Sequence, residues 1–158
     1  MSITFEGPAV FVADMDRSRH FYESILKQEV MADFVENLLF TSGFSIWRAG
    51  HATSVIYKGK RKTQATLGHD NLELYFETAE LDATWEAVSS QWDDIIHPIE
   101  EAPWGQRGFR LHDPDGHIVE VAEPLPVLIK RLLVEGLTPE EVSKRTSVPV
   151  DMVNAMSK

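Results

Sequence analysis

Charged side chains that could do chemistry lie close together in the stretch RGFRLHDPDGHIVEV, residues 107–121. Its DPDGH motif, residues 113–117, is typical of a tight hairpin, because the proline presets the turn and the glycine supplies the left-handed residue that closes it. If the first and last residues of this motif face each other, Arg110 faces Glu120 across the hairpin, and His112 shares their face. A guanidinium, an imidazole and a carboxylate on one face could bind a ligand or transfer protons.

Two interpretations of the charged pair stay open. Arg110 and Glu120 could form a cross-strand ion pair of modest strength. Alternatively, Arg110 presents a fixed, forked positive charge to a carboxylate or another anionic ligand group. His112 could act as a general acid or base, but no nucleophile accompanies it in the sequence, which favours a polar cavity histidine.

Aromatic and amide side chains are expected on the same surface as this pair. Strand parity places Trp47 and Tyr75 there, and the PWG motif places Trp104 at its mouth. Such rings suit flat organic ligands, although they could also fill the cavity or form a dimer contact. For Trp104 we favour contact with a ligand, and for Trp47 both interpretations stay open. Asn71 is expected on a strand of this surface, with His69 two residues earlier on the same strand face. It could orient a ligand or bind only water and neighbouring strands.

These residues are positioned by a pattern that occurs twice. In the first half, alternating Val10 and Val12 precede a run with helical spacing, and a shift of 64 residues places Val12 on Phe76 and Phe21 on Trp85. After each helix come short β-like segments, at 29–35, 37–42 and 44–50, then at 95–103, 107–113 and 117–123. The sequence therefore predicts an α+β fold of two tandem βαβββ units, which form a curved mixed sheet with a concave pocket.

A helical extension follows Pro124. We expect helices over 127–135, 139–146 and 150–156, the second opened by a capping box between Thr138 and Glu141. This predicts two domains, 1–123 and a helix-turn-helix-like 124–158. The third helix carries no arginine, so packing against the body or a second subunit is favoured over DNA binding.

Composition excludes several classes of protein. The 158 residues include no cysteine, which rules out disulfides and thiolate metal sites and favours a reducing, cytoplasmic location. A net charge of −10 argues against nucleic-acid and anionic-membrane partners, and the basic cluster at 58–62 is interpreted as a solvated loop. Neither a secretory signal nor an apolar membrane span is expected.

The segments VFVADMDRSRHFY (10–22) and PWGQRGFRLHDPDGHIVEV (103–121), together with the repeat, resemble the vicinal oxygen chelate superfamily. This superfamily includes glyoxalases, bleomycin resistance proteins and extradiol dioxygenases, so the resemblance implies the paired fold but leaves the activity open. Carried over by position, its metal ligands fall on Gly7, Asn71 and Glu120. Only Glu120 is a competent ligand, so we expect no metal and no other cofactor. A shifted metal site would use Glu120, His69 and His112.

The function that follows is metal-independent binding of a small organic molecule, such as sequestration of an antibiotic-like or aromatic ligand, by a homodimer. One alternative is a lyase, isomerase or dioxygenase that uses Glu120 with a non-standard metal site. Another is a ligand-responsive regulatory module in which the C-terminal helices report ligand occupancy.

Overall fold

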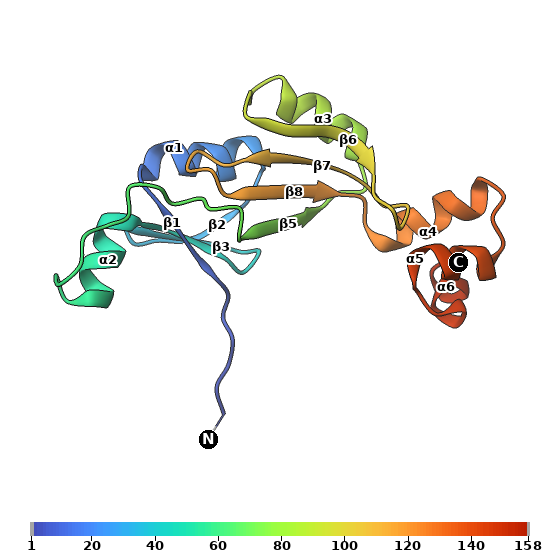
Figure 1. Cartoon of the computed structure of the whole chain (residues 1–158), viewed down its shortest axis with the longest axis horizontal. Coiled ribbons are helices and arrows are strands. Elements are labelled where there is room, and N and C mark those ends of the chain that lie inside the picture. The colour runs from blue at the N-terminus through green and yellow to red at the C-terminus, as the bar shows by residue number, and fades with distance from the viewer. Residues whose placement is uncertain (1, 158) are drawn as a thin grey trace. The chain divides into compact units, whose positions relative to one another are not determined.

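The computed structural model of the protein describes residues 2–157 (Figure 1). The chain divides into two compact units, Met1–Leu72 with His112–Ile118, and Glu73–Leu111 with Val119–Lys158. Within the described residues, no helix is both long and apolar enough to cross a membrane.

The first unit follows the predicted βαβββ order and adds one helix. Its elements are β1 (Ala9–Val12), α1 (Met15–Arg19), the π-helix η1 (His20–Ile25), β2 (Val30–Asp33), β3 (Asn37–Phe40), β4 (Ser45–Arg48) and α2 (Ala49–Tyr57). The strands form a sheet in the order β1-β4-β3-β2, in which β1 runs parallel to β4. Asp14 caps α1, because its side chain accepts a hydrogen bond from the backbone N–H of Arg17.

The second unit repeats this plan. Its elements are β5 (Glu73–Glu77), α3 (Leu81–Ser89), β6 (Ile95–Glu101), β7 (Arg107–His112) and β8 (Ile118–Ala122). The sheet order is β5-β8-β7-β6, which is the order of the first sheet shifted by four strands. The expected α+β fold of two βαβββ units with C-terminal helices is therefore confirmed.

One face of each sheet is buried, as the alternation of apolar residues predicts. In the hairpin of β7 and β8, the buried apolar side chains are those expected, namely Phe109, Leu111, Val119 and Val121. Trp85 of α3 packs edge-on against Phe109, with ring centroids 5.1 Å apart. The polar residues of the hairpin, Arg110 and Glu120, alternate with these side chains and therefore lie on the opposite face of the sheet.

Helix α2 was not predicted from the sequence. Its residues, AGHATSVIY, carry no broad apolar stripe, and the side chains that it buries are the small Ala49, Ala52 and Thr53. A helix with so weak a periodicity gives little signal in the sequence. The basic cluster that follows, residues 58–62, is exposed throughout, in agreement with a solvated loop.

The C-terminal helices are α4 (Leu125–Val134), α5 (Pro139–Thr146) and α6 (Val150–Met156). Figure 1 shows them gathered at the C-terminal end of the chain, in orange and red. The predicted capping box of α5 is present, and α4 begins two residues before its predicted start. They share a buried apolar cluster of Leu128, Ile129, Leu132, Val142 and Val153. These helices belong to the second unit.

Candidate functional site

The register of the β7–β8 hairpin agrees with the sequence prediction. The backbone N–H of Asp113 donates to the carbonyl oxygen of His117 over 2.9 Å, and Gly116 has the left-handed φ of +86°. As a result, Arg110 Nη2 lies 2.7 Å from Glu120 Oε2. The ion pair expected across the hairpin is present.

Each nitrogen of the Arg110 guanidinium makes one contact within the protein. Nε donates to Glu73 Oε1 over 2.7 Å, Nη2 donates to Glu120, and Nη1 lies 3.3 Å from His97 Nε2. Two carboxylates therefore face one guanidinium, which leaves an excess of negative charge among these three groups. An anionic ligand group would have to compete with both carboxylates for Arg110.

The electrostatic environment shifts the pKa of both members of the pair. Burial raises the pKa of Glu120 and the Glu73 carboxylate adds to this, while Arg110 opposes them, and the net shift is upward. For Arg110, burial works to lower the pKa, but the hydrogen bonds and charges of Glu73 and Glu120 outweigh it and raise the pKa. The guanidinium therefore stays charged.

We predict that Glu120→Gln gains stability relative to the unsubstituted protein as the pH rises from about 4 to about 7. A raised pKa in the folded protein means that the stabilising contribution of Glu120 is present below its unfolded pKa and is lost as the pH rises through its folded pKa. Glutamine does not ionise and has no such loss. Urea unfolding at several pH values measures the difference, with the exposed Glu86→Gln as control. An opposite slope would contradict the upward shift.

Two aromatic rings lie on the same unit and are tied together by one amide. Gln106 Nε2 donates to the Tyr75 hydroxyl over 2.8 Å, and Gln106 Oε1 accepts from Trp104 Nε1 over 3.0 Å. Trp104 is 45% exposed and Tyr75 is 47% exposed. Partial burial and a hydrogen bond to Glu77 raise the pKa of Tyr75 to about 12, so its hydroxyl stays protonated at neutral pH. Both rings thus have their polar atoms satisfied while much of their surface faces solvent.

A cavity of about 220 Å³ adjoins these groups. It is lined by His97, Glu100, Glu101, Ala102, Pro103, Trp104, Gln106, Gly108, Arg110 and Glu120. The residues come from β6, β7, β8 and the loop between β6 and β7, so the hairpin and its neighbouring strand build the site. Its walls combine an aromatic ring with acidic and amide groups.

The predicted site residues divide between the two units. Tyr75, Trp104, Arg110 and Glu120 belong to the second unit, which brings them together as described. Trp47, Asn71 and His112 belong to the first unit. Their participation in the same site stays a prediction.

The first-unit residues are placed as follows. Trp47 lies on β4, donates from Nε1 to His51 Nδ1 over 2.9 Å and meets Phe11 edge-on. His112 ends β7 and is half-buried. Because β5 begins at Glu73, Asn71 and His69 precede the strand and are exposed, so their expected place on a strand face is corrected.

Sequence reasoning missed His97 and Gln106. His97 is the strand partner of Arg110. The β6–β7 pairing slips between Ile95 and His97, and such a slip cannot be read from alternation alone. Gln106 had one signal, which is its position directly after the PWG motif.

The residues at the metal positions implied by the resemblance do not fit a divalent metal. Gly7 has φ +121°, and a Cβ there would lie 1.8 Å from the carbonyl oxygen of Gly43, so no ligating side chain fits without a backbone shift. Glu120 is held by a guanidinium, which repels a cation. Within either unit of the described residues 2–157, no group of three or more His, Asp or Glu side chains could hold a metal ion. The shifted set of Glu120, His69 and His112 draws on both units and stays a prediction.

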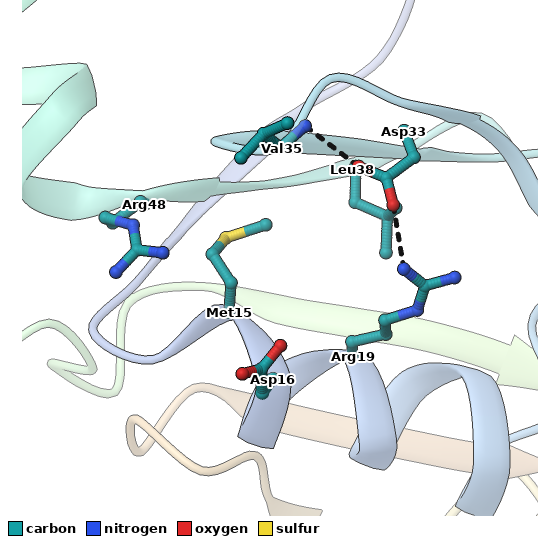
Figure 2. Close-up of a pocket in the computed structure, with 7 residues that line it drawn as sticks. All are labelled: Met15, Asp16, Arg19, Asp33, Val35, Leu38 and Arg48. Carbon is teal, nitrogen blue, oxygen red and sulfur yellow. Dashed lines mark hydrogen bonds and ion pairs between the residues drawn. The ribbon is translucent and has the colours of Figure 1, made fainter.

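Another cavity, of about 240 Å³, lies in the first unit (Figure 2). Figure 2 shows Met15 between Arg48 and the pair formed by Arg19 and Asp33. Arg19 Nη1 donates to Asp33 over 2.8 Å, and Arg48 pairs with Glu36. The residues that line this cavity include no aromatic ring, so it suits a flat organic ligand less well than the site of the second unit.

Comparisons with known proteins agree with this fold. The Glyoxalase-like domain family matches residues 5–126. A protein of unknown function from Agrobacterium tumefaciens str. C58 is 38% identical, with 79% of this chain and 97% of that chain covered and a TM-score of 0.74. No curated protein matches the chain.

Two further structures are similar in fold alone. A lactoylglutathione lyase from Agrobacterium tumefaciens is 18% identical, with 78% of this chain and 95% of that chain covered and a TM-score of 0.60. TioX from Micromonospora sp. ML1 is 17% identical, with 77% and 99% covered and a TM-score of 0.58. The family match spans most of the chain, and the fold and hairpin motif agree with it. The chain therefore belongs to the Glyoxalase-like domain family.

Proposed function

We propose that this protein binds a small planar aromatic molecule without a metal ion, at the surface formed by Trp104, Tyr75 and the Arg110 cluster. The cluster consists of Arg110, Glu73, Glu120 and His97. In this proposal the protein sequesters its ligand rather than converting it.

The observation that carries the proposal is the pair of exposed rings held by Gln106. An exposed ring that is free to rotate loses conformational entropy when it stacks on a ligand. Here the hydrogen bonds from Trp104 and to Tyr75 fix both rings beforehand, so less entropy is lost on binding. Aromatic walls with a few polar groups are typical of sites for flat organic molecules.

The charges of the cluster favour one class of ligand. Two carboxylates outnumber the one guanidinium, and Glu100 also lines the cavity, whereas Glu101 is paired with Arg145. We therefore propose a ligand whose ring system carries a positive charge or hydrogen-bond donors. We favour this class over the anionic group that Arg110 could attract, because Arg110 already pairs with two carboxylates.

Trp104→Ala is predicted to weaken the binding of N-methylquinolinium, a cationic two-ring compound, by about tenfold or more. Stacking on one aromatic side chain contributes about 1–3 kcal/mol. Isothermal titration calorimetry measures the affinity, in buffer with and without EDTA. The matched control is Tyr57→Ala, which removes an aromatic side chain of similar exposure from α2 in the first unit.

The proposal is supported if N-methylquinolinium binds more tightly than 1-naphthoate, an anion of the same ring size, and if Trp104→Ala removes this binding. It is contradicted if the anion binds more tightly, if Trp104→Ala binds like the unsubstituted protein, or if EDTA abolishes binding.

A further inference from the structure

We propose that Arg131, in the C-terminal helices, is a positioning residue for Trp104, and that these helices thereby set the geometry of the ligand site. The contacts run through the loop Ala102–Gln106, which joins β6 to β7 and carries Trp104. The effect on ligand binding rests on the proposed function, whereas the effect on Trp104 does not.

Arg131 holds the loop and the end of β8 at once. Its Nη2 donates to the carbonyl oxygen of Gly105 over 2.6 Å and to Glu123 Oε1 over 2.7 Å. Glu123 is only 3% exposed, so this carboxylate depends on Arg131 for its compensating charge. The hydrogen bond from Arg131 to Glu123 is the main cause that raises the pKa of Arg131. The guanidinium of Arg131 therefore stays charged.

Glu123 in turn holds the residues on which the aromatic rings depend. Its Oε1 accepts from the backbone N–H of Arg107 over 3.0 Å, and its carbonyl oxygen accepts from Gln106 Nε2 over 2.7 Å. Gln106 is the amide that fixes both Trp104 and Tyr75. A continuous series of hydrogen bonds thus joins α4 to the ring of Trp104.

A second arginine of the extension lies against the same loop. Arg145 of α5 pairs with Glu101 at the end of β6. Gly105 has φ +94°, and a Cβ there would lie 3.0 Å from Arg145 Nε. The loop therefore passes close beneath this guanidinium in a backbone conformation that favours glycine. Arg131 of α4 and Arg145 of α5 thus both lie against Gly105 of this loop.

The helices can act as a support because they have a core of their own. Arg131 lies on α4 beside Leu128 and Leu132, which are buried in the cluster that the three helices share. The Glyoxalase-like domain match ends at residue 126, before Arg131. Arg131 thus lies outside the matched family domain. In this proposal the C-terminal helices have a role at the ligand site that needs no contact with nucleic acid.

The test uses the full chain labelled with 5-fluorotryptophan, whose ¹⁹F spectrum reports each tryptophan separately. Trp104→Phe assigns the Trp104 signal, and the signal of Trp85, which packs on Phe109, reports the core of the same unit. The variant is Arg131→Met with Glu123→Gln, which removes both charges and leaves no buried carboxylate unpaired. The matched control is Arg19→Met with Asp33→Asn, because it removes an arginine–carboxylate side-chain pair that lies in the first unit.

We expect the Trp104 signal of the variant to move toward that of a solvent-exposed indole and to sharpen, while the Trp85 signal stays in place. Arg131→Lys, which retains the charge but not the fork, should give an intermediate Trp104 signal. The control pair should change neither signal. The proposal is overturned if the Trp104 signal does not move, or if Trp85 moves with it, which would indicate a general loss of structure. If the double variant does not fold, Arg131→Lys decides by the same criterion.

A second measurement separates this proposal from the proposed function. If N-methylquinolinium binds the unsubstituted protein, the double variant should bind it about tenfold more weakly, and equal binding would contradict the link to the site. If the unsubstituted protein does not bind this compound, the proposed function fails, while the ¹⁹F spectrum still tests the positioning of Trp104.

Discussion

Asp113→Asn is expected to lower the free energy of unfolding by about 3–5 kcal/mol, because it breaks a buried charged network. Asp113 is 1% exposed. Its carboxylate accepts from the Tyr22 hydroxyl over 2.8 Å, from the backbone N–H groups of Asp115 and His117 over 2.9 Å each, and lies 2.9 Å from His117 Nδ1. An asparagine NH₂ group cannot accept hydrogen bonds, so at least one of these donors would be left unsatisfied.

The same network predicts a change in acid stability. Burial alone would raise the pKa of Asp113, but hydrogen bonds and charge from His117, with the Tyr22 hydroxyl, hold it below its usual value. The stabilising contribution of Asp113 is therefore present above its unfolded pKa and is lost as the pH falls through its folded pKa. Asp113→Asn should show a smaller loss of stability between about pH 5 and about pH 2 than the unsubstituted protein.

Urea unfolding followed by circular dichroism measures both effects. The control is Asp151→Asn, which changes an exposed carboxylate in the first turn of α6. A loss below about 1 kcal/mol for Asp113→Asn, or an unchanged acid limb, would show that the hairpin network contributes little.

Leu132→Ala is expected to lower the free energy of unfolding by about 3 kcal/mol, since truncating a fully buried leucine leaves a cavity. Leu132 is 0% exposed within the cluster formed by α4, α5 and α6. Arg131 lies on α4, so a loosened α4 would no longer hold Arg131 firmly against the loop of Trp104. The substitution should therefore also broaden the ¹⁹F signal of Trp104. The control is Val134→Ala on the same helix, since that side chain is 88% exposed and its truncation should cost little.

Urea unfolding and the ¹⁹F spectrum together decide the outcome for Leu132→Ala. A loss of stability without any change at Trp104 would show that the helices pack independently of the ligand site. An unchanged free energy of unfolding would contradict the expected contribution of Leu132 to the packing of the cluster.

Local features of this protein were predictable from the sequence. The hairpin register, the buried face of β7 and β8, and the capping box of α5 were all expected correctly. Each depends on residues within a few positions of one another, where proline, glycine and capping side chains restrict the backbone. The repeated pattern and the hairpin motif also identified the fold and the family.

Features without a clear apolar periodicity were not predicted from the sequence. Helix α2 buries only small side chains, and β5 starts at Glu73 rather than further upstream, so Asn71 and His69 are not on a strand. The slip between β6 and β7 brought His97 beside Arg110, which alternation could not indicate. In each case the position depends on pairing with a distant strand or on close backbone packing.

Sequence patterns alone predict the two βαβββ units, the turn that pairs Arg110 with Glu120 and the three C-terminal helices. The packing of distant segments is needed to see that Glu73 joins Glu120 on one guanidinium, and that Arg131 and Gln106 fix the loop of Trp104. Turns and caps depend on the adjacent backbone, whereas side-chain hydrogen bonds between distant segments depend on how strands and helices pack.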